Sequence, residues 1–140
     1  MLPDIHDHGL LGYCVSFDHS EIALRTLPDQ REHSEPVTAR EVIFEGCVAH
    51  HFERADYGTI LGGISELPLE SFVSEHAAQF DAGHRASGWP SWWRGSLPEA
   101  LAYLRQEQIT AFEIESSYGF SGWILARSVR ASEPKPHPTA

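Results

Sequence analysis

The first part of the chain alternates apolar and polar residues with a period of two. This pattern runs through residues 10–17 and resumes through residues 22–26, after the short polar segment Asp18-His19-Ser20. A period of two is typical of a strand that buries one face. Because only a few residues separate the two runs, the pattern predicts a β-hairpin.

Two further strands are expected before the period changes. Residues 37–52 predict one long strand with a bulge or bend at Gly46. Residues 57–64 predict a shorter strand, in which several glycines suggest close approach of another backbone. The polar segment 28–36 is bounded by prolines, so we expect it to form a loop between the hairpin and these strands.

A helical period then replaces the strand pattern. Apolar residues recur at spacings of three and four over residues 69–80, which places them on one stripe of an amphipathic helix. A second helix is expected to begin at Ser96, because its hydroxyl can cap the first turn and Glu99 completes a capping box. The buried face of this second helix is predicted to consist of Leu97, Ala100, Leu101 and Leu104.

The strand pattern returns after the second helix. Residues 109–115 and 122–129 predict two more strands. Residues 131–140 contain three prolines and no large apolar side chain, so we expect a disordered tail after a single domain that spans residues 1–130. The order of elements predicts an α+β fold, with a mainly antiparallel sheet of about six strands and two helices packed on one face.

The charge of the chain narrows the classes of partner. The formal net charge is -10, from 20 acidic and 10 basic residues, and the only lysine is Lys135. A field of this sign repels phosphate backbones, so we do not expect a nucleic-acid partner. Two interpretations stay open: the acidic surface keeps the protein dispersed, or it attracts a basic partner.

The sequence also indicates a cellular compartment. No run approaches the roughly 18 consecutive apolar residues of a membrane span, and the N-terminus lacks the pattern of a secretion signal. Cys14 and Cys47 each lie in an apolar strand-like run, where a free thiol behaves as a small buried hydrophobe. We therefore expect a cytoplasmic protein that has no membrane partner and no structural disulfide.

An N-terminal cluster is the one candidate for a metal site. If the segment is extended, Asp4, His6 and His8 share a side, and two histidines with one carboxylate can hold zinc or iron. The alternative is that a His-Asp pair hydrogen-bonds a turn at the entrance of the first strand. His50 and His51 are adjacent, so in a strand their side chains point to opposite faces and cannot chelate as a pair.

The sequence gives little support for a known catalytic motif. The segment Gly119-Phe120-Ser121-Gly122-Trp123 is superficially similar to a nucleophile elbow, but Trp123 replaces the second glycine and a strand is expected to follow. The chain contains no phosphate-binding loop of the G-x-x-x-x-G-K type. The sequence therefore favours neither a serine hydrolase nor a nucleotide hydrolase, and it implies no cofactor.

A tryptophan-rich segment is the best candidate for a binding surface. Residues 83–95 form a connection that is long for two packed elements, and they contain Trp89, Trp92, Trp93 and Arg94. Tryptophan and arginine often anchor protein interfaces, so we take these residues, together with Tyr118, as candidate partner-binding residues. The alternative is that the rings fold over the sheet and cover the core.

Three segments resemble a broad group of small bacterial proteins of largely unassigned function. They are Leu2-Pro3-Asp4-Ile5-His6-Asp7, Ile43-Phe44-Glu45-Gly46-Cys47 and the run from Phe112 to Trp123. Some members of similar groups are regarded as immunity proteins encoded beside polymorphic toxins. The resemblance implies binding to a toxin rather than catalysis, and it transfers no catalytic residue.

These observations favour a cytoplasmic protein-binding domain, with an immunity protein that neutralises a basic toxin as its specific form. One alternative is a small metal-dependent enzyme built on the N-terminal Asp/His cluster. Another is a structural protein whose aromatic residues only close its core. Salt-sensitive association with a basic partner would indicate the first class, and a bound metal would indicate the second.

Overall fold

The period-two pattern near the N-terminus folds into the expected hairpin. In the computed structural model, which describes residues 2–29, 37–54, 57–132 and 135–136, β1 (Gly9–Ser16) pairs antiparallel with β2 (Glu21–Leu27). Ile22 and Leu24 of β2 are fully buried, as the alternation predicts. The expected loop at residues 28–36 lies almost entirely outside the described residues.

The single strand expected over residues 37–52 is wrong, because the chain forms two strands there. β3 (Thr38–Glu45) pairs with β2, whereas β4 (Ala49–Glu53) pairs with β7 (Ser121–Ala126) in a distant part of the sheet. Gly46 separates them with a φ of 66°, a left-handed conformation that glycine tolerates well. A Cβ at this position would also lie 2.8 Å from the side chain of Arg127. The expected bend is therefore a change of strand partner.

The second half of the chain completes the sheet with further antiparallel pairs. β5 (Ile60–Leu67) pairs with β6 (Thr110–Tyr118), and β6 pairs with β7. The strand expected over residues 122–129 is also split: β7 ends at Ala126, and β8 (Ser128–Ala131) pairs with β3. The order is β4-β7-β6-β5-β1-β2-β3-β8, so this path holds eight strands rather than about six.

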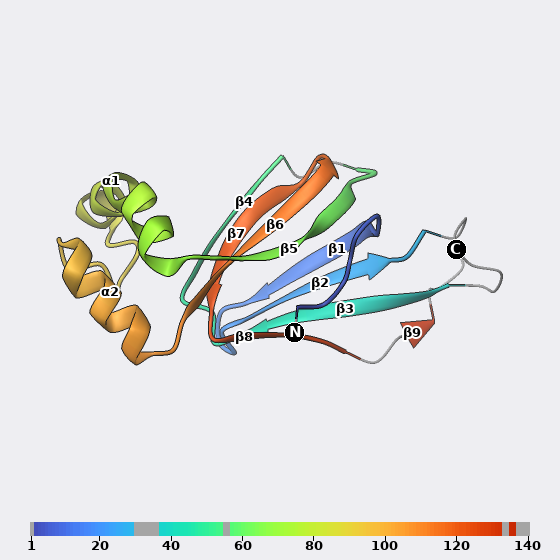
Figure 1. The fold of residues 1–140 in the computed structure, drawn as a ribbon, viewed down its shortest axis with the longest axis horizontal. Coiled ribbons are helices and arrows are strands. Elements are labelled where there is room, and N and C mark those ends of the chain that lie inside the picture. Colours follow the sequence, from blue (N-terminus) through green and yellow to red (C-terminus); the bar gives the residue numbers. More distant parts are fainter. Residues whose placement is uncertain (1, 30–36, 55–56, 133–134, 137–140) are drawn as a thin grey trace.

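Both splits occur at one place in the fold. The backbone amide of Arg127, between β7 and β8, donates to the carbonyl oxygen of Glu45 at the end of β3, over 2.9 Å. The chain therefore passes twice between the β3 half of the sheet and the β7 half at neighbouring positions. Strands that are contiguous in sequence change partners there, which makes the sheet curl instead of lying flat (Figure 1).

The two helices follow the predicted pattern, but α1 (Leu69–Ser87) continues past residue 83, so the first part of the connection expected over residues 83–95 is helical. α1 buries Phe72, Val73 and Phe80, and α2 (Leu97–Gln106) buries Ala100, Leu101 and Leu104. Ser96 caps α2, since its hydroxyl accepts from the backbone amide of Glu99 over 3.4 Å. Figure 1 shows the two helices together at one end of the sheet. No helix in the described ranges is both long enough and apolar enough to cross a membrane.

The apolar residues form two cores, one on each face of β6 and β7. Ala111 and Leu125 belong to the core beneath the helices, whereas their chain neighbours Phe112 and Ile124 belong to the core inside the curled sheet. These two strands are therefore buried on both faces near the helices, which explains the unbroken apolar run of β7. Ile5 of the N-terminal segment also packs into the inner core.

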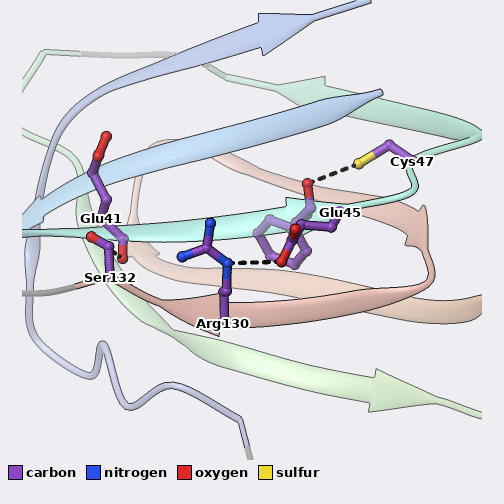
Figure 2. Close-up of polar contacts among 6 residues, drawn as sticks. Glu41, Glu45, Cys47, Arg130 and Ser132 are labelled. Carbon is purple, nitrogen blue, oxygen red and sulfur yellow. Dashed lines mark hydrogen bonds and ion pairs between the residues drawn. The ribbon is translucent and has the colours of Figure 1, made fainter. Parts of the chain in front are cut away.

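β8 is fastened to β3 by side chains as well as by backbone pairing. Arg130 Nε of β8 donates to Glu45 Oε1 of β3 over 2.8 Å (Figure 2). Just after β3, Cys47 Sγ donates to the carbonyl oxygen of Phe44 over 3.4 Å, a bond within the same segment. The C-terminal segment was expected to be disordered. Residues 133–134 and 137–140 lie outside the described ranges, while β9 (Lys135–Pro136) pairs with β3.

Candidate functional site

The outer face of β4, β7, β6 and β5 presents its side chains in rows across the four strands. Strand pairing aligns the row beneath the helices as Ala49, Leu125, Ala111 and Leu67. It aligns the next row as His51, Trp123, Glu113 and Ser65. One step further from the helices, Glu53 is paired with Ser121 and Glu115 with Gly63. The outer face thus changes from apolar to acidic within two rows.

The acidic rows line a groove with a volume of about 540 Å³. Three glutamates, Glu53, Glu113 and Glu115, contribute to its wall, and no lysine or arginine does so among the described residues. His51 Nε2 lies 3.0 Å from Glu53 Oε1, so this carboxylate has a partner within the groove. Neither Glu113 nor Glu115 forms an ion pair in the described part of the chain.

The carboxyl groups of Glu113 and Glu115 interact directly with each other. Burial raises the pKa of Glu113 above its ordinary value, and a hydrogen bond with the Glu115 side chain adds to the shift. Repulsion from the charges of Glu115 and of Glu75 on α1 raises the pKa of Glu113 further. The groove therefore concentrates carboxyl groups without a lysine or arginine beside them among the residues that the structure describes.

The floor of the groove is rigid because aromatic rings hold Trp123. Its ring packs edge-on against Phe72 at 5.0 Å and against His76 at 5.5 Å, and His51 stacks on it at 6.2 Å. Gly122 beside it leaves no room for a side chain, since a Cβ there would collide with the backbone carbonyl oxygen of His51. β4 therefore lies close against β7, which places Glu53 near the other carboxylates.

The tryptophan-rich segment divides between core and surface. Trp92 and Trp93 are only 4% and 3% exposed, and their indole N–H groups are hydrogen-bonded. Trp92 Nε1 donates to the carbonyl oxygen of Val48 over 3.3 Å, and Trp93 Nε1 donates to Asp81 Oδ1 over 3.0 Å. These two rings cover the core and present no binding surface. Trp89 is 37% exposed and is the one ring of the three that meets solvent.

The other candidate partner-binding residues are exposed but do not lie together on one surface. Arg94 follows the two buried tryptophans and is exposed. Tyr118 is 59% exposed and pairs across the sheet with Ile60. It is the last residue of β6, a strand that runs away from the helices in Figure 1. The structure therefore does not bring Tyr118 together with the tryptophan-rich segment.

The N-terminal candidates for metal binding do not converge on one site in the described part of the chain. The chain turns at Asp7, whose φ is 61°, so the segment is not extended as the metal hypothesis requires. His6 is exposed with its Nδ1 3.2 Å from Asp7 Oδ2, whereas His8 is buried with its Nδ1 3.0 Å from Thr26 Oγ1. Asp4 Oδ1 accepts from the backbone amide of His6. No group of three potential ligands that could hold a metal occurs among the residues described.

The residues that line the acidic groove were not singled out from the sequence. Glu113 and Glu115 lie in the strand expected over residues 109–115 without a role of their own, and Trp123 was noted only because it breaks a nucleophile motif. Two glutamates spaced by two in a strand of a chain with net charge -10 are the signal that could have marked them. Comparison of the chain with protein-family models, with curated proteins and with solved structures found no match.

Proposed function

We propose that this protein is a protein-binding domain whose acidic groove receives a basic segment of a partner. The observation that carries this proposal is the Glu113–Glu115 pair, in which two adjacent carboxyl groups share a groove that no described lysine or arginine lines. An arginine or lysine from a partner would meet opposite charge on a rigid floor. The positive charge of the partner would offset the repulsion between the carboxyl groups, which adds to the effect of burial in raising the pKa of Glu113.

The charge of the whole chain supports the same class of partner. A net charge of -10 accelerates encounter with a basic protein and disfavours acidic ones. Within the groove, hydrogen bonds from a guanidinium or ammonium group to carboxylates are stronger than bonds between neutral groups. Long-range charge therefore favours the approach of a basic segment, and the groove provides the contacts that hold it.

The specific form of this function that we propose is a cytoplasmic immunity protein whose partner is a basic toxin. Its support is the acidic groove together with the sequence resemblance described above. Both cysteines are free thiols, which suits a reducing compartment, although Cys14 is exposed and not buried as its apolar run predicts. Co-purification of the protein with the product of a neighbouring toxin gene tests this form directly.

The groove itself is tested with a basic peptide and two matched variants. The double substitution Glu113→Gln/Glu115→Gln removes two charges inside the groove, and Glu66→Gln/Glu99→Gln removes two charges outside it. We expect the groove variant to bind hexa-arginine at least about tenfold more weakly than the unmodified protein, and the control variant to stay within about twofold. Equal losses in both variants would show that only net charge matters and would contradict the proposal.

A further inference from the structure

A second, smaller cavity lies between the β1–β2 hairpin, the start of β4 and Trp89. Its volume is about 220 Å³, below the roughly 300–1,000 Å³ of pockets that take drug-sized ligands. Its lining includes Phe17, Glu21, Cys47, His50 and Trp89. None of its lining residues lines the acidic groove. We refer to it as the aromatic pocket.

Aromatic rings from three different segments form the wall of the aromatic pocket. Phe17 projects from the hairpin turn and is 83% exposed, which is a large exposed surface for a phenylalanine. Its ring centroid lies 6.5 Å from that of His50 on β4. Trp89, the exposed member of the tryptophan-rich segment, contributes the third ring. Aromatic rings carry negative charge on their faces, so such a wall attracts cations.

The position of Trp89 is fixed by its neighbours on α1. Its ring packs edge-on against Phe80 with centroids 5.9 Å apart. Gly83 gives the segment room, because a Cβ at that position would lie 2.6 Å from the carbonyl oxygen of Trp89. His84 Nδ1 lies 2.9 Å from the carbonyl oxygen of Pro90, the next residue. This wall of the pocket is therefore formed before any ligand arrives.

The charged and titratable groups around the pocket also suit a cation. Among the described lining residues Glu21 is the one acidic residue and none is lysine or arginine. Glu21 forms no ion pair with any described residue. Burial raises the pKa of the Cys47 thiol to about 12, so the thiol stays neutral. Burial also lowers the pKa of His50, with the charge of His51 acting in the same direction. At neutral pH the imidazole of His50 is therefore uncharged and does not repel a cation.

We propose that the aromatic pocket binds an alkylated ammonium group, such as a trimethylammonium. Ring faces and a single carboxylate attract the positive charge of such a group. A plain ammonium would lose its water and find few acceptors for its three N–H groups on aromatic walls, which is costly. A trimethylammonium has no N–H group to satisfy, and its methyl groups pack on the rings. The pocket therefore selects alkylated cations over plain ones.

This inference goes beyond the proposed function and stands independently of it. The aromatic pocket and the acidic groove share no lining residue, so either can fail while the other holds. The same chemical group occurs on methylated lysine side chains and on choline. Free choline and a peptide that contains trimethyllysine therefore serve as two separate probes. The probe that binds more tightly shows which molecule supplies the trimethylammonium group.

The experiment is a titration of the whole protein with tetramethylammonium chloride, followed by the indole N–H resonance of Trp89 in NMR spectra. Ammonium chloride and guanidinium chloride at the same ionic strength are the reference cations. The variants are Trp89→Leu, Phe17→Ala and Glu21→Gln, and the indole resonance of Trp92 or a backbone amide of β4 reports where Trp89 is absent. Tyr118→Leu is the control, because it removes an exposed aromatic ring outside the pocket.

We expect saturable binding of tetramethylammonium with a millimolar dissociation constant, and at least about tenfold weaker binding of ammonium. Each pocket variant should weaken binding at least about fivefold, and Tyr118→Leu should leave it within about twofold. Because Phe17 is so exposed, Phe17→Ala should remain folded even where Trp89→Leu does not. Equal responses to all three cations, or unchanged binding in Phe17→Ala and Glu21→Gln, would overturn the proposal. Tighter binding of guanidinium would overturn it too.

Discussion

Glu113 and Glu115 project from the same face of β6, and Glu115 adds to the effect of burial in raising the pKa of Glu113, while neither carboxyl group forms an ion pair in the described part of the chain. Their spacing of two along a strand makes this neighbourhood unavoidable. Glu75 on α1 adds a third negative charge that acts on Glu113. A cluster of this kind lowers the stability of the isolated fold, and a cationic partner relieves the cost.

Neutralising Glu113 should stabilise the isolated protein at neutral pH. The pKa of Glu113 is raised above its ordinary value of 4.5, so the folded protein holds its proton more tightly than the unfolded chain does. The stability contributed by this group is therefore highest below pH 4.5 and is lost as the pH rises through the raised pKa. We expect Glu113→Gln to raise the free energy of unfolding at pH 7 by no more than about 1 kcal/mol.

The pH dependence of the stability gained by Glu113→Gln is the control for this prediction. Below pH 4.5 the glutamate is protonated in both states, so the difference between Glu113→Gln and the unmodified protein should shrink. Urea unfolding at several pH values measures it. A Glu113→Gln variant that is less stable at pH 7 would show that the carboxylate stabilises the fold.

Binding of a basic segment should favour the ionised form of the Glu113–Glu115 pair and so release a proton. A nearby cation favours the ionised carboxylate, so the pKa of Glu113 falls when the groove is filled. We therefore expect affinity for hexa-arginine to weaken as the pH is lowered through the raised pKa of Glu113. Calorimetry in buffers of different ionisation enthalpy detects the released proton. Affinity that is constant over this pH window would contradict the role given to the pair.

Gly122 should be intolerant of a side chain, because β4 packs against it. A Cβ there would collide with the backbone carbonyl oxygen of His51. We expect Gly122→Ala to lower the free energy of unfolding by about 1–3 kcal/mol, the usual range for overpacking. Gly12→Ala is the matched control, since a Cβ at Gly12 meets no atom within 4 Å. Denaturant unfolding should show a clear loss for the first variant and little change for the second.

Trp92 and Trp93 should matter for stability, not for partner contact. Both rings are buried in the core beneath the helices, so replacement of either by alanine should cost about 3–5 kcal/mol. Trp93→Ala also leaves Asp81 without its indole donor. Phe17→Ala, which removes an exposed ring, should cost far less. Similar thermal unfolding of all three variants would contradict the burial described.

The two cysteines should differ sharply in reactivity. Cys14 is exposed on β1, whereas burial raises the pKa of Cys47 to about 12 and its thiol donates to the carbonyl oxygen of Phe44. Thiolates are the reactive form, so a thiol-labelling reagent at neutral pH should modify Cys14 and spare Cys47 in the folded protein. Mass spectrometry reads the label, and unfolding the protein first should make both cysteines react.

Periodicity along the sequence predicted which segments are helices and which are strands, but not where one strand ends and the next begins with a new neighbour. The apolar stripe of α1 and the Ser96 cap of α2 are local features, and both were confirmed. The changes of partner at Gly46 and Arg127 depend on residues far apart in the chain, which a local pattern does not reveal. The sequence therefore predicted one strand over residues 37–52 and one over residues 122–129, where the fold has two strands in each case.

The same limit applies to the candidate site. The alternation of β6 indicates that Glu113 and Glu115 face away from the inner core, but not that β4 and α1 bring Glu53 and Glu75 beside them. Whether a tryptophan covers the core or meets solvent depends on acceptors such as the carbonyl oxygen of Val48, which only the fold supplies. The tryptophan-rich segment therefore could not be divided into core and surface rings beforehand.

The most direct test of the central claim is an NMR titration of the protein with hexa-arginine, read at the backbone amides. If the acidic groove receives a basic segment, the largest chemical-shift changes should map to the groove positions on β6 and β7, including Glu113, Glu115 and Trp123. The changes should diminish as salt is added, because charge drives the association. Shifts that scatter over the whole acidic surface, or that cluster away from these strands, would contradict the account.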